Sequence, residues 1–266
     1  MTPESPSGQR PPPLLAARQI TAGYGSVPVV RGVSVEAAPG EVALVIGPNG
    51  AGKSTLIKSL NGELNLMSGS VWLAGEDVSG LSANQRAARG LGYVPQSRDV
   101  FGPLTVTENL EMGGYALPRR EAQARVAEIL DRFPQLARLR RREAQTLSGG
   151  ERKLLAIARA LVAEPTALML DEPTANLSPA VAEHVLGEVI GGLAGSGRAI
   201  LLIEQRLALA LDAATWVYVL VDGEPRFSGS AQAFKSLPDM GAVFFASTAV
   251  ASAQSHAQAP RPNGAP

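Results

Sequence analysis

The chain has 266 residues, of which 45% are hydrophobic, and this is enough for one large domain or two small ones. Lysine and arginine together number 24, as do aspartate and glutamate. A protein held to nucleic acid mainly through its phosphates usually has a basic excess, so this balance argues against nucleic acid as a partner. Cysteine is absent, which excludes disulfides and thiolate metal sites.

Both ends of the chain are expected to be disordered tails. Residues 1–13 are polar and proline-rich and contain no apolar segment of the kind that signal peptides carry. The tail expected at residues 241–266 ends in a stretch rich in alanine, serine, glutamine and proline. No apolar run between them approaches the roughly 20 residues needed to span a bilayer. We therefore expect one folded domain over residues 14–240, with any membrane role coming through partner chains.

Short β-rich runs alternate with helical patterns between the tails, which favours an α/β fold with a largely parallel sheet. The first two strands are expected at Leu14–Ile20 and Val29–Val35. Val42–Ile46 is a continuous apolar run, as expected for a central strand covered on both faces. A helix is predicted at Lys53–Leu60, and Gly69–Val78 is expected to join the first strands in an antiparallel layer.

The middle of the chain is helical in character. Thr105 and Glu108 form a capping box, and Arg119–Phe133 is a charged stretch with helical apolar spacing. We expect a helical subdomain, inserted at about residues 97–163. The strand pattern then resumes, and the remaining elements are predicted as strands at Ala167–Leu170, Ile200–Ile203 and Val217–Val221 and helices at about Pro179–Leu193 and Arg206–Ala214.

Residues Gly47–Ser54 fit the phosphate-loop pattern G-x-x-x-x-G-K-[ST]. The glycines let successive backbone N–H groups turn towards phosphate oxygens. Lys53 can reach the β- and γ-phosphates, and the Ser54 hydroxyl can bind Mg²⁺. A glycine-rich turn that arose by chance is the alternative. The buried strand before the loop and the helix after it favour phosphate binding.

Two acids, Asp171 and Glu172, follow the apolar run Leu168–Leu170. At the carboxyl edge of a parallel sheet, Asp171 can hold Mg²⁺ through its water shell. Glu172 can orient or deprotonate an attacking water. A solvated pair of acids at a strand end is the alternative, and the phosphate loop elsewhere in the chain favours the catalytic interpretation.

The run Leu147–Glu151 precedes a strong helical pattern. Ser148 and Glu151 form a second capping box, so the simplest interpretation is a helix start. Gly149 and Gly150 also leave backbone N–H groups exposed at a helix N-terminus, which makes an anion site. Because the chain already has one phosphate loop, this second anion site suggests a nucleotide shared between two subunits.

Together these motifs resemble those of the ATPase subunits of ABC transporters. Gly47–Ser54 is similar to the family's Walker A motif, Leu170–Glu172 to its Walker B motif and Leu147–Glu151 to its signature sequence, in the same order and spacing. The resemblance runs from Leu14 to about Gly229. It implies a RecA-like P-loop NTPase core with an antiparallel β layer and an inserted helical subdomain. It also implies an ATPase whose cofactors are ATP and Mg²⁺.

The resemblance assigns single residues as well. Tyr24 matches the aromatic residue that stacks on adenine, with a plain turn aromatic as the alternative. Gln96 matches the Q-loop glutamine, whose neighbourhood docks on the membrane subunit, with a polar loop as the alternative. Glu172 matches the catalytic glutamate, and Gln205 occupies the switch position. The residues implied to bind nucleotide are Tyr24, Gly47, Pro48, Asn49, Gly50, Ala51, Gly52, Lys53, Ser54, Thr55, Gln96, Ser148, Gly149 and Gly150, and those implied to bind Mg²⁺ are Ser54, Gln96 and Asp171.

Two positions depart from the common family pattern. Gln205 stands where the family usually has histidine, and Ser178 stands where it commonly has aspartate. An amide can donate a hydrogen bond to the γ-phosphate but cannot carry a proton charge. Hydrolysis is still expected because Glu172 is present. Both departures resemble the ATPases of branched-chain amino-acid importers, although many of those have glutamate where this chain has Gln96.

This narrower resemblance implies a subunit that energises uptake, most directly of branched-chain amino acids. Urea, short amides and other small solutes are alternatives, because the ATPase does not touch the cargo. The implied partners are a second ABC ATPase subunit, identical or different, the membrane permease subunits and, indirectly, a substrate-binding protein. The implied location is cytoplasmic, on the inner face of the cell membrane.

Two other classes of function are alternatives. A soluble ABC ATPase of DNA repair or translation usually has long coiled-coil insertions or two ATPase halves, and neither is present. A regulatory subunit that binds nucleotide without hydrolysing it is the other alternative. A steady-state ATPase assay distinguishes such a subunit from a catalytic one. The basic run Arg138–Arg142 is interpreted as a solvated face of the helical subdomain, with contact to lipid headgroups or a partner as the alternative.

Overall fold

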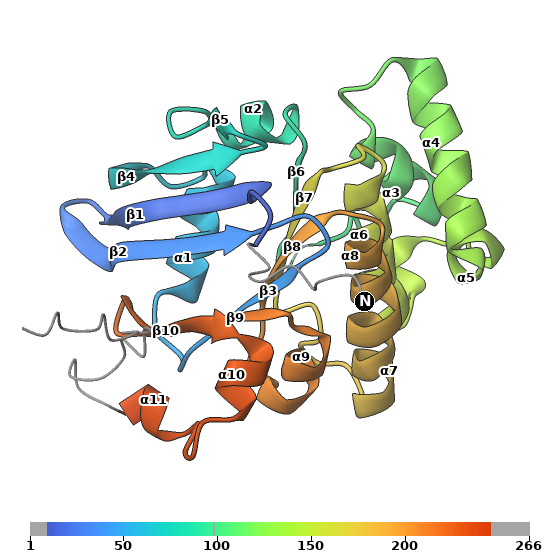
Figure 1. Ribbon diagram of the computed structural model, residues 1–266. Coiled ribbons are helices and arrows are strands. Elements are labelled where there is room, and N and C mark those ends of the chain that lie inside the picture. The colour runs from blue at the N-terminus through green and yellow to red at the C-terminus, as the bar shows by residue number, and fades with distance from the viewer. Residues whose placement is uncertain (1–9, 98, 246–266) are drawn as a thin grey trace, which may run out of the picture.

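The computed structural model describes residues 10–97 and 99–245 (Figure 1). Most of both predicted tails lies outside the described residues. Arg10, within the first tail, is hydrogen-bonded to Glu41 at 2.6 Å and lies over the Trp216 ring at 4.4 Å. Helix α11 (Ala242–Phe245) occupies the start of the second tail, and its Phe244 packs against the main core. The folded part therefore extends beyond the predicted limits at both ends.

One of the two sheets is antiparallel and has the strand order β2-β1-β4-β5. Its strands are β1 (Leu15–Tyr24), β2 (Val27–Ala37), β4 (Leu66–Leu73) and β5 (Glu76–Asp77). The sequence predicted the first two strands and their antiparallel layer. In Figure 1 this sheet forms a separate layer on the side of the molecule away from the helical subdomain.

The second sheet has six strands in the order β10-β9-β3-β8-β7-β6. All neighbours are parallel except β9 and β10, which form an antiparallel hairpin. The strands are β3 (Val42–Ile46), β6 (Leu91–Val94), β7 (Ala167–Asp171), β8 (Ala199–Ile203), β9 (Trp216–Val221) and β10 (Glu224–Ser230). Every residue of β3, β7 and β8 is buried, which explains their continuous apolar sequences.

The side chains of β3 face two different cores in alternation. Val42, Leu44 and Ile46 pack in the core that the parallel sheet shares with the helical subdomain and the C-terminal helices. Ala43 and Val45 pack in a second core with helix α1 and the antiparallel sheet. Strand β3 is therefore held from both faces, and the loop that follows it begins at a fixed place.

The described helices number eleven α-helices, one 3₁₀ turn and one π-helical segment. They are α1 (Lys53–Asn61), α2 (Ala83–Ala87), α3 (Val106–Gly113), α4 (Arg119–Arg132), α5 (Pro134–Arg138), η1 (Ala144–Thr146), α6 (Gly149–Leu161), α7 (Pro179–His184), η2 (Val185–Ile190), α8 (Gly191–Gly195), α9 (Leu207–Ala213), α10 (Ala231–Lys235) and α11. Within residues 10–97 and 99–245, no helix is long and apolar enough to cross a membrane.

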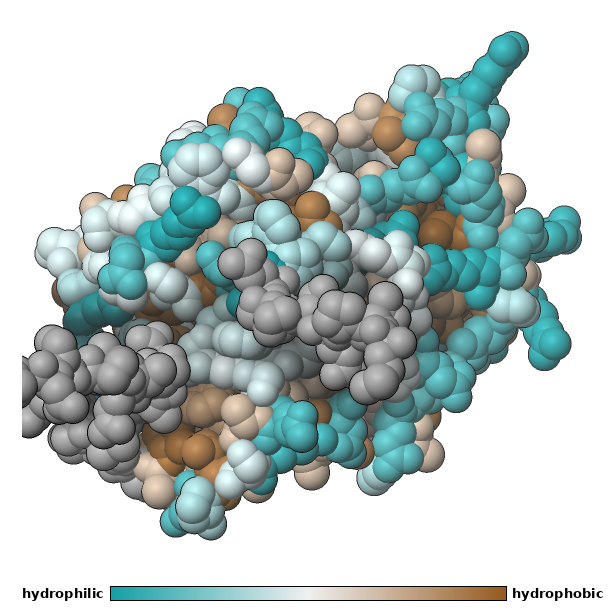
Figure 2. Space-filling model, in the orientation of Figure 1, coloured by the Kyte–Doolittle hydropathy of each residue, from teal (hydrophilic) through white to brown (hydrophobic). Residues whose placement is uncertain are grey.

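Helices α3 to α5 form a lobe beside the parallel sheet, drawn in green in Figure 1, and α6 runs from this lobe along the sheet. The capping boxes that start α3 and α6 are both present: Thr105 and Ser148 each accept from the backbone N–H three residues on, and Glu108 and Glu151 accept in return. The outer surface of α4 is hydrophilic (Figure 2), whereas its Val126 is buried. The α/β core, the antiparallel layer and the helical insertion are thus confirmed.

Candidate nucleotide site

The phosphate loop lies between the end of β3 and the start of α1. Gly52 has a φ of +95°, a left-handed conformation that favours glycine, and it turns the chain into the helix. A Cβ on Gly47 would lie 2.0 Å from the carbonyl oxygen of Leu220, so no side chain fits there. The loop is therefore packed directly against strand β9. The start of α1, which follows the loop, can offer the N–H groups of its first turn to an anion.

Lys53 is folded back over its own loop. Its Nζ donates to the carbonyl oxygens of Gly47 at 2.6 Å and Pro48 at 3.0 Å. Burial lowers the pKa of Lys53, and the charges of Glu172 and Asp171 oppose that change. The two carbonyl contacts hold the ammonium in the curl of the loop, where phosphate oxygens can replace them.

Asp171 is the last residue of β7 and is 7% exposed. Burial, and secondly the charge of Glu172, raises the pKa of Asp171 to about 6, while the positive charges of Lys53, Lys153 and Lys58 oppose the shift. An anionic Asp171 is therefore costly in this place unless a cation is nearby. This is the electrostatic setting in which a carboxylate binds a metal ion well.

Glu172 follows at the edge of the sheet and has a φ of +46°. This left-handed conformation costs about 1–2 kcal/mol for a residue with a side chain. The backbone N–H of Glu172 donates to the carbonyl oxygen of Ile203 at 2.9 Å, which anchors the turn to strand β8. Strain of this kind is typical of functional sites, where the surrounding structure fixes the direction of one side chain.

Two amides hold the Glu172 carboxylate. Gln96 Nε2, from the loop after β6, donates to Glu172 Oε2 at 2.7 Å. Gln205 Nε2, from the loop after β8, donates to Glu172 Oε1 at 2.5 Å. Three residues singled out in the sequence, from the ends of three adjacent strands, therefore meet at one carboxylate.

Next to Gln205 lies a buried acid that the sequence pattern does not single out. Glu204 is 2% exposed. Its Oε1 accepts from the Thr174 hydroxyl at 2.7 Å and backbone N–H at 2.9 Å, and its Oε2 accepts from the Gln205 N–H at 3.2 Å. Glu204 thereby joins the segment after Glu172 to the segment that carries Gln205. The available signal was an acid directly after an apolar strand, but the sequence cannot show that this acid points inward.

The predicted second anion site lies at the start of α6. Ser148 is the N-cap, and Ser148 and Gly149 are exposed. A Cβ on Gly150 would lie 2.7 Å from Cγ1 of Val181 on α7, so the helix start is packed closely against that neighbour. Among the described residues, no hydrogen bond or ion pair joins this site to the phosphate loop of the same chain. The two predicted anion sites are thus not joined to each other within the described residues.

Tyr24 lies at the end of a strand and Ser178 at the start of a helix. Tyr24 ends β1, and its side chain is 54% exposed, so its ring is free to stack on a flat ligand. Ser178 is the N-cap residue of α7, and Pro179 is the first residue of that helix. Arg206, beside Gln205, donates to the carbonyl oxygen of Leu177 at 2.8 Å. This hydrogen bond joins the turn before α7 to the segment that carries Gln205.

The oxygen groups at the sheet edge fit Mg²⁺. Ser54 is exposed at the start of α1, Asp171 ends β7, and Gln96 lies on the adjacent loop. Across the part of the chain that the structure describes, no group of three or more His, Cys, Asp or Glu side chains could hold a metal. A site with one carboxylate and one hydroxyl suits Mg²⁺, which retains waters and takes its other ligands from substrate phosphates.

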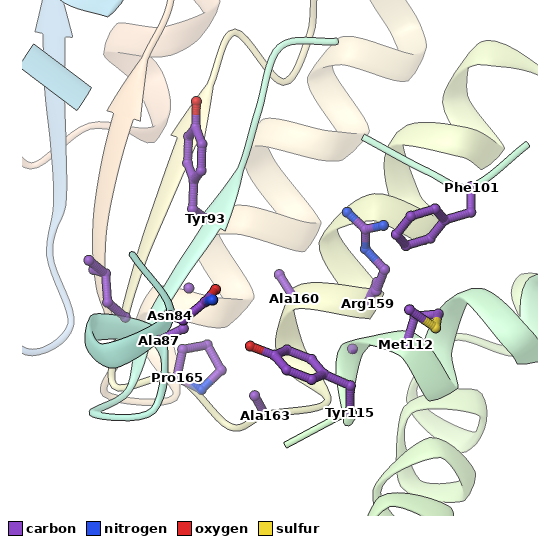
Figure 3. A pocket seen from close by; sticks show the side chains of 13 residues that line it. Asn84, Ala87, Tyr93, Phe101, Met112, Tyr115, Arg159, Ala160, Ala163 and Pro165 are labelled. Carbon is purple, nitrogen blue, oxygen red and sulfur yellow. The ribbon is translucent and has the colours of Figure 1, made fainter. Parts of the chain in front are cut away.

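A groove of about 480 Å³ lies between α2, β6, α3 and the C-terminal half of α6 (Figure 3). Phe101, Met112 and Tyr115 line it and are 45%, 43% and 65% exposed. Arg159 lies over the Phe101 ring at 5.0 Å. Figure 3 shows Tyr93 on the opposite side of the groove from Phe101 and Met112. Exposed large apolar side chains around a hollow are typical of a surface that binds another protein.

The fold and these motifs define a P-loop ATPase with an inserted helical subdomain. The ABC transporter family model matches residues 30–175. The chain is 40% identical to the "Probable branched-chain amino acid transport ATP-binding protein LivF" of Archaeoglobus fulgidus, over 82% of this chain and 92% of that protein. It is 39% identical to the "High-affinity branched-chain amino acid transport ATP-binding protein BraG" of Pseudomonas aeruginosa, over 79% of this chain and 90% of that protein.

More distant relatives have other cargoes. The chain is 34% identical to the "Lipopolysaccharide export system ATP-binding protein LptB" of Acidithiobacillus ferridurans, over 87% of this chain and 96% of that protein. Among solved structures, a nucleotide-free ATP-binding cassette from an ABC transporter superposes with a TM-score of 0.78 at 28% identity, over 88% of this chain and all of that one. The chain therefore belongs to the ABC transporter ATP-binding family, and it is an ATPase that serves as the ATP-binding subunit of a transporter.

Proposed function

We propose that this chain hydrolyses ATP with Glu172 as the catalytic residue and powers the uptake of branched-chain amino acids. The observation that supports the catalytic part is the Glu172 carboxylate, held by Gln96 and Gln205 at the edge of the sheet that also carries the phosphate loop. Each carboxylate oxygen keeps a second lone pair. Glu172 can therefore accept a proton from a water while the two amides hold its direction.

The other residues bind and orient the nucleotide. The backbone of residues 47–52 and the N-terminal end of α1 bind the phosphates, Lys53 binds the β- and γ-phosphates, and Tyr24 stacks on the adenine. Ser54, Asp171 and Gln96 are the residues that would hold Mg²⁺, which neutralises charge on the phosphates when bound. Gln205 donates to the γ-phosphate or to Glu172 and carries no proton in the reaction.

A second ATPase subunit, identical or different, completes the site. Ser148 and Gly149 are exposed at a helix N-terminus and are not joined to the chain's own phosphate loop, which supports binding of the partner's ATP. Closing two such subunits on two nucleotides would exclude water from the γ-phosphates except for the attacking molecule.

The groove lined by Phe101, Met112 and Tyr115 is proposed as the docking site of the membrane permease subunit. It opens at the boundary between the parallel sheet and the helical subdomain, beside the loop that carries Gln96. Docking there would place the chain on the inner face of the cell membrane and would link permease movement to the hydrolysis site. A substrate-binding protein would then act only indirectly, through the permease.

Cargo is inferred from the relatives, because no residue of the site touches it. Identities of 40% and 39% to two branched-chain amino-acid transport subunits, against 34% to a lipopolysaccharide export subunit, favour amino acids. The test is ATP turnover of the chain with its own permease and binding protein in proteoliposomes. Stimulation by leucine, isoleucine or valine is expected. Stimulation only by urea or amides would overturn the cargo proposal.

The same assay tests the catalytic role. ATP turnover by the parent and none by Glu172→Gln is expected. Parent protein that binds ATP without turning it over, in the presence of its permease, would instead identify a non-catalytic regulatory subunit.

A further inference from the structure

A buried ion pair joins the loop that carries Gln96 to the helix that carries the second anion site. Lys153 Nζ, in the second turn of α6, lies 2.6 Å from Asp99 Oδ2. The two side chains are only 7% and 16% exposed. Lys153 Nζ also lies 3.5 Å from the carbonyl oxygen of Gln96 itself. Neither residue belongs to a motif of the site described above.

The burial of this pair makes it a firm connection. A buried ammonium requires a partner, because removing it from water is otherwise costly. Removing either member would leave the other charge buried without compensation, so the pair resists separation more than an exposed pair does. The exposed pair Arg125–Glu164, at 2.7 Å on the helical subdomain, offers a natural comparison.

Gln96 and Asp99 are therefore each held by a residue of another element. The Gln96 amide donates to Glu172, and Asp99 pairs with Lys153. Helix α6 is a rigid element whose start is fixed by the Ser148 capping box. Lys153 lies five residues after that N-cap, so a displacement of the helix start also displaces the anchor of the loop.

We propose that Lys153 and Asp99 are positioning residues for ATP hydrolysis. The pair holds Gln96 against Glu172, and it transmits the position of the α6 N-terminus to the chain's own hydrolysis site. This inference rests on the proposed roles of Glu172 and of Ser148–Gly150. When a partner's nucleotide engages the start of α6, the helix carries Lys153 and Asp99 with it, and Gln96 is set in place for the reaction.

The test compares the parent with Asp99→Asn and Lys153→Met. Both are expected to retain the KM for ATP within about twofold and to lose about tenfold or more of kcat, because the phosphate loop is untouched and Gln96 is no longer fixed. Lys153→Arg, which keeps the charge, is expected to recover most of the kcat. Glu164→Gln, the matched exposed-pair variant, is expected to keep parental kcat and KM.

A second measurement tests directly whether the Lys153–Asp99 pair holds the segment that carries Gln96. Hydrogen–deuterium exchange of the peptide spanning residues 93–101 is expected to speed up about tenfold in Asp99→Asn and to stay unchanged in Glu164→Gln. Unchanged exchange there, or a kcat within twofold of the parent, overturns the inference. So does a general loss in which the thermal midpoint, the KM and the kcat all change together and Lys153→Arg restores none of them.

Failure of the inference is distinguishable from failure of the proposed function. If the parent turns over ATP, Glu172→Gln does not, and Asp99→Asn behaves as the parent, the catalytic role stands and the positioning role is wrong. If Glu172→Gln turns over ATP as fast as the parent, the proposed catalytic role is wrong and the positioning role falls with it.

Discussion

Replacing Arg86 with methionine tests how the helix after the phosphate loop is held. Arg86 is 1% exposed, and its guanidinium donates to four backbone carbonyl groups. Two of these, of Ser59 at 2.8 Å and Leu60 at 2.6 Å, lie in the last turn of α1, where carbonyl groups have no partner within the helix. Arg86 thus caps the helix that begins at Lys53.

The magnitude follows from the contacts that are lost. Methionine retains most of the packing of the aliphatic part of the Arg86 side chain, so the main effect of the substitution is the loss of the guanidinium hydrogen bonds. The Ser59 carbonyl keeps a hydrogen bond from the Gly62 N–H at 3.2 Å, so of these two the Leu60 carbonyl is the one left unpaired. An unpaired buried carbonyl costs about 1–3 kcal/mol, and relief from burying the charge offsets part of this loss. We expect the free energy of unfolding to fall by about 1–3 kcal/mol for Arg86→Met. Urea denaturation followed by circular dichroism measures it.

The matched control is Arg89→Met. Arg89 lies just after the same helix α2, but its side chain is 38% exposed and pairs with Glu76 at the surface. Loss of such a pair changes stability by about 0–1 kcal/mol. If Arg86→Met destabilises the protein no more than Arg89→Met does, the buried guanidinium is not the cap that the structure indicates.

Three further changes have defined outcomes. Glu172→Gln is expected to abolish ATP turnover, while the Kd for ATP, measured by calorimetry, stays within about threefold of the parent because the amide keeps the shape of the side chain. Unaltered turnover would contradict the role of Glu172. Asp171→Asn is expected to raise the thermal midpoint at pH 7.5 in EDTA without nucleotide. In the folded protein the pKa of Asp171 is raised to about 6, so the parent loses stability as pH rises from the ordinary pKa of an aspartate through 6. The difference in thermal midpoint between variant and parent should therefore shrink below pH 6. A difference that persists at pH 4 would refute the ionisation of Asp171 as its cause. Gly150→Ala is expected to lower kcat in the assembled transporter by about tenfold, because its methyl group meets Val181 at the α6 N-terminus. Val181→Ala should restore activity to this variant, and no restoration would show that the clash is not the cause.

The central strands and the phosphate loop were readable from the sequence because local pattern and burial agree there. Val42–Ile46 is apolar throughout because both of its faces are covered, and its predicted limits match β3. The two capping boxes predicted the starts of α3 and α6 because the N-cap and N3 side chains act within one turn. These are short-range effects, and the amino-acid sequence contains all of their parts.

Strand β10 shows where local pattern is insufficient. Glu224–Ser230 contains Pro225 and glycine, has no clean alternation and is at best half-buried, so it was not predicted. It is a strand because β9 supplies its hydrogen-bond partners across the turn at Asp222 and Gly223, both in left-handed conformations. The turn was a usable signal, but the strand itself depends on its neighbour.

The sequence by itself determined the class of this protein, a P-loop ATPase of the ABC family, from the phosphate-loop pattern, the acidic pair after an apolar run and the glycines at a helix start. Only the tertiary structure decided that Gln96 and Gln205 meet at one carboxylate, and that Lys153 pairs with Asp99 54 residues away. The physical reason is the distance along the chain over which each interaction acts. Capping, turns and strand burial act between neighbours along the chain, whereas ion pairs and hydrogen bonds between loops depend on which strands the sheet places side by side.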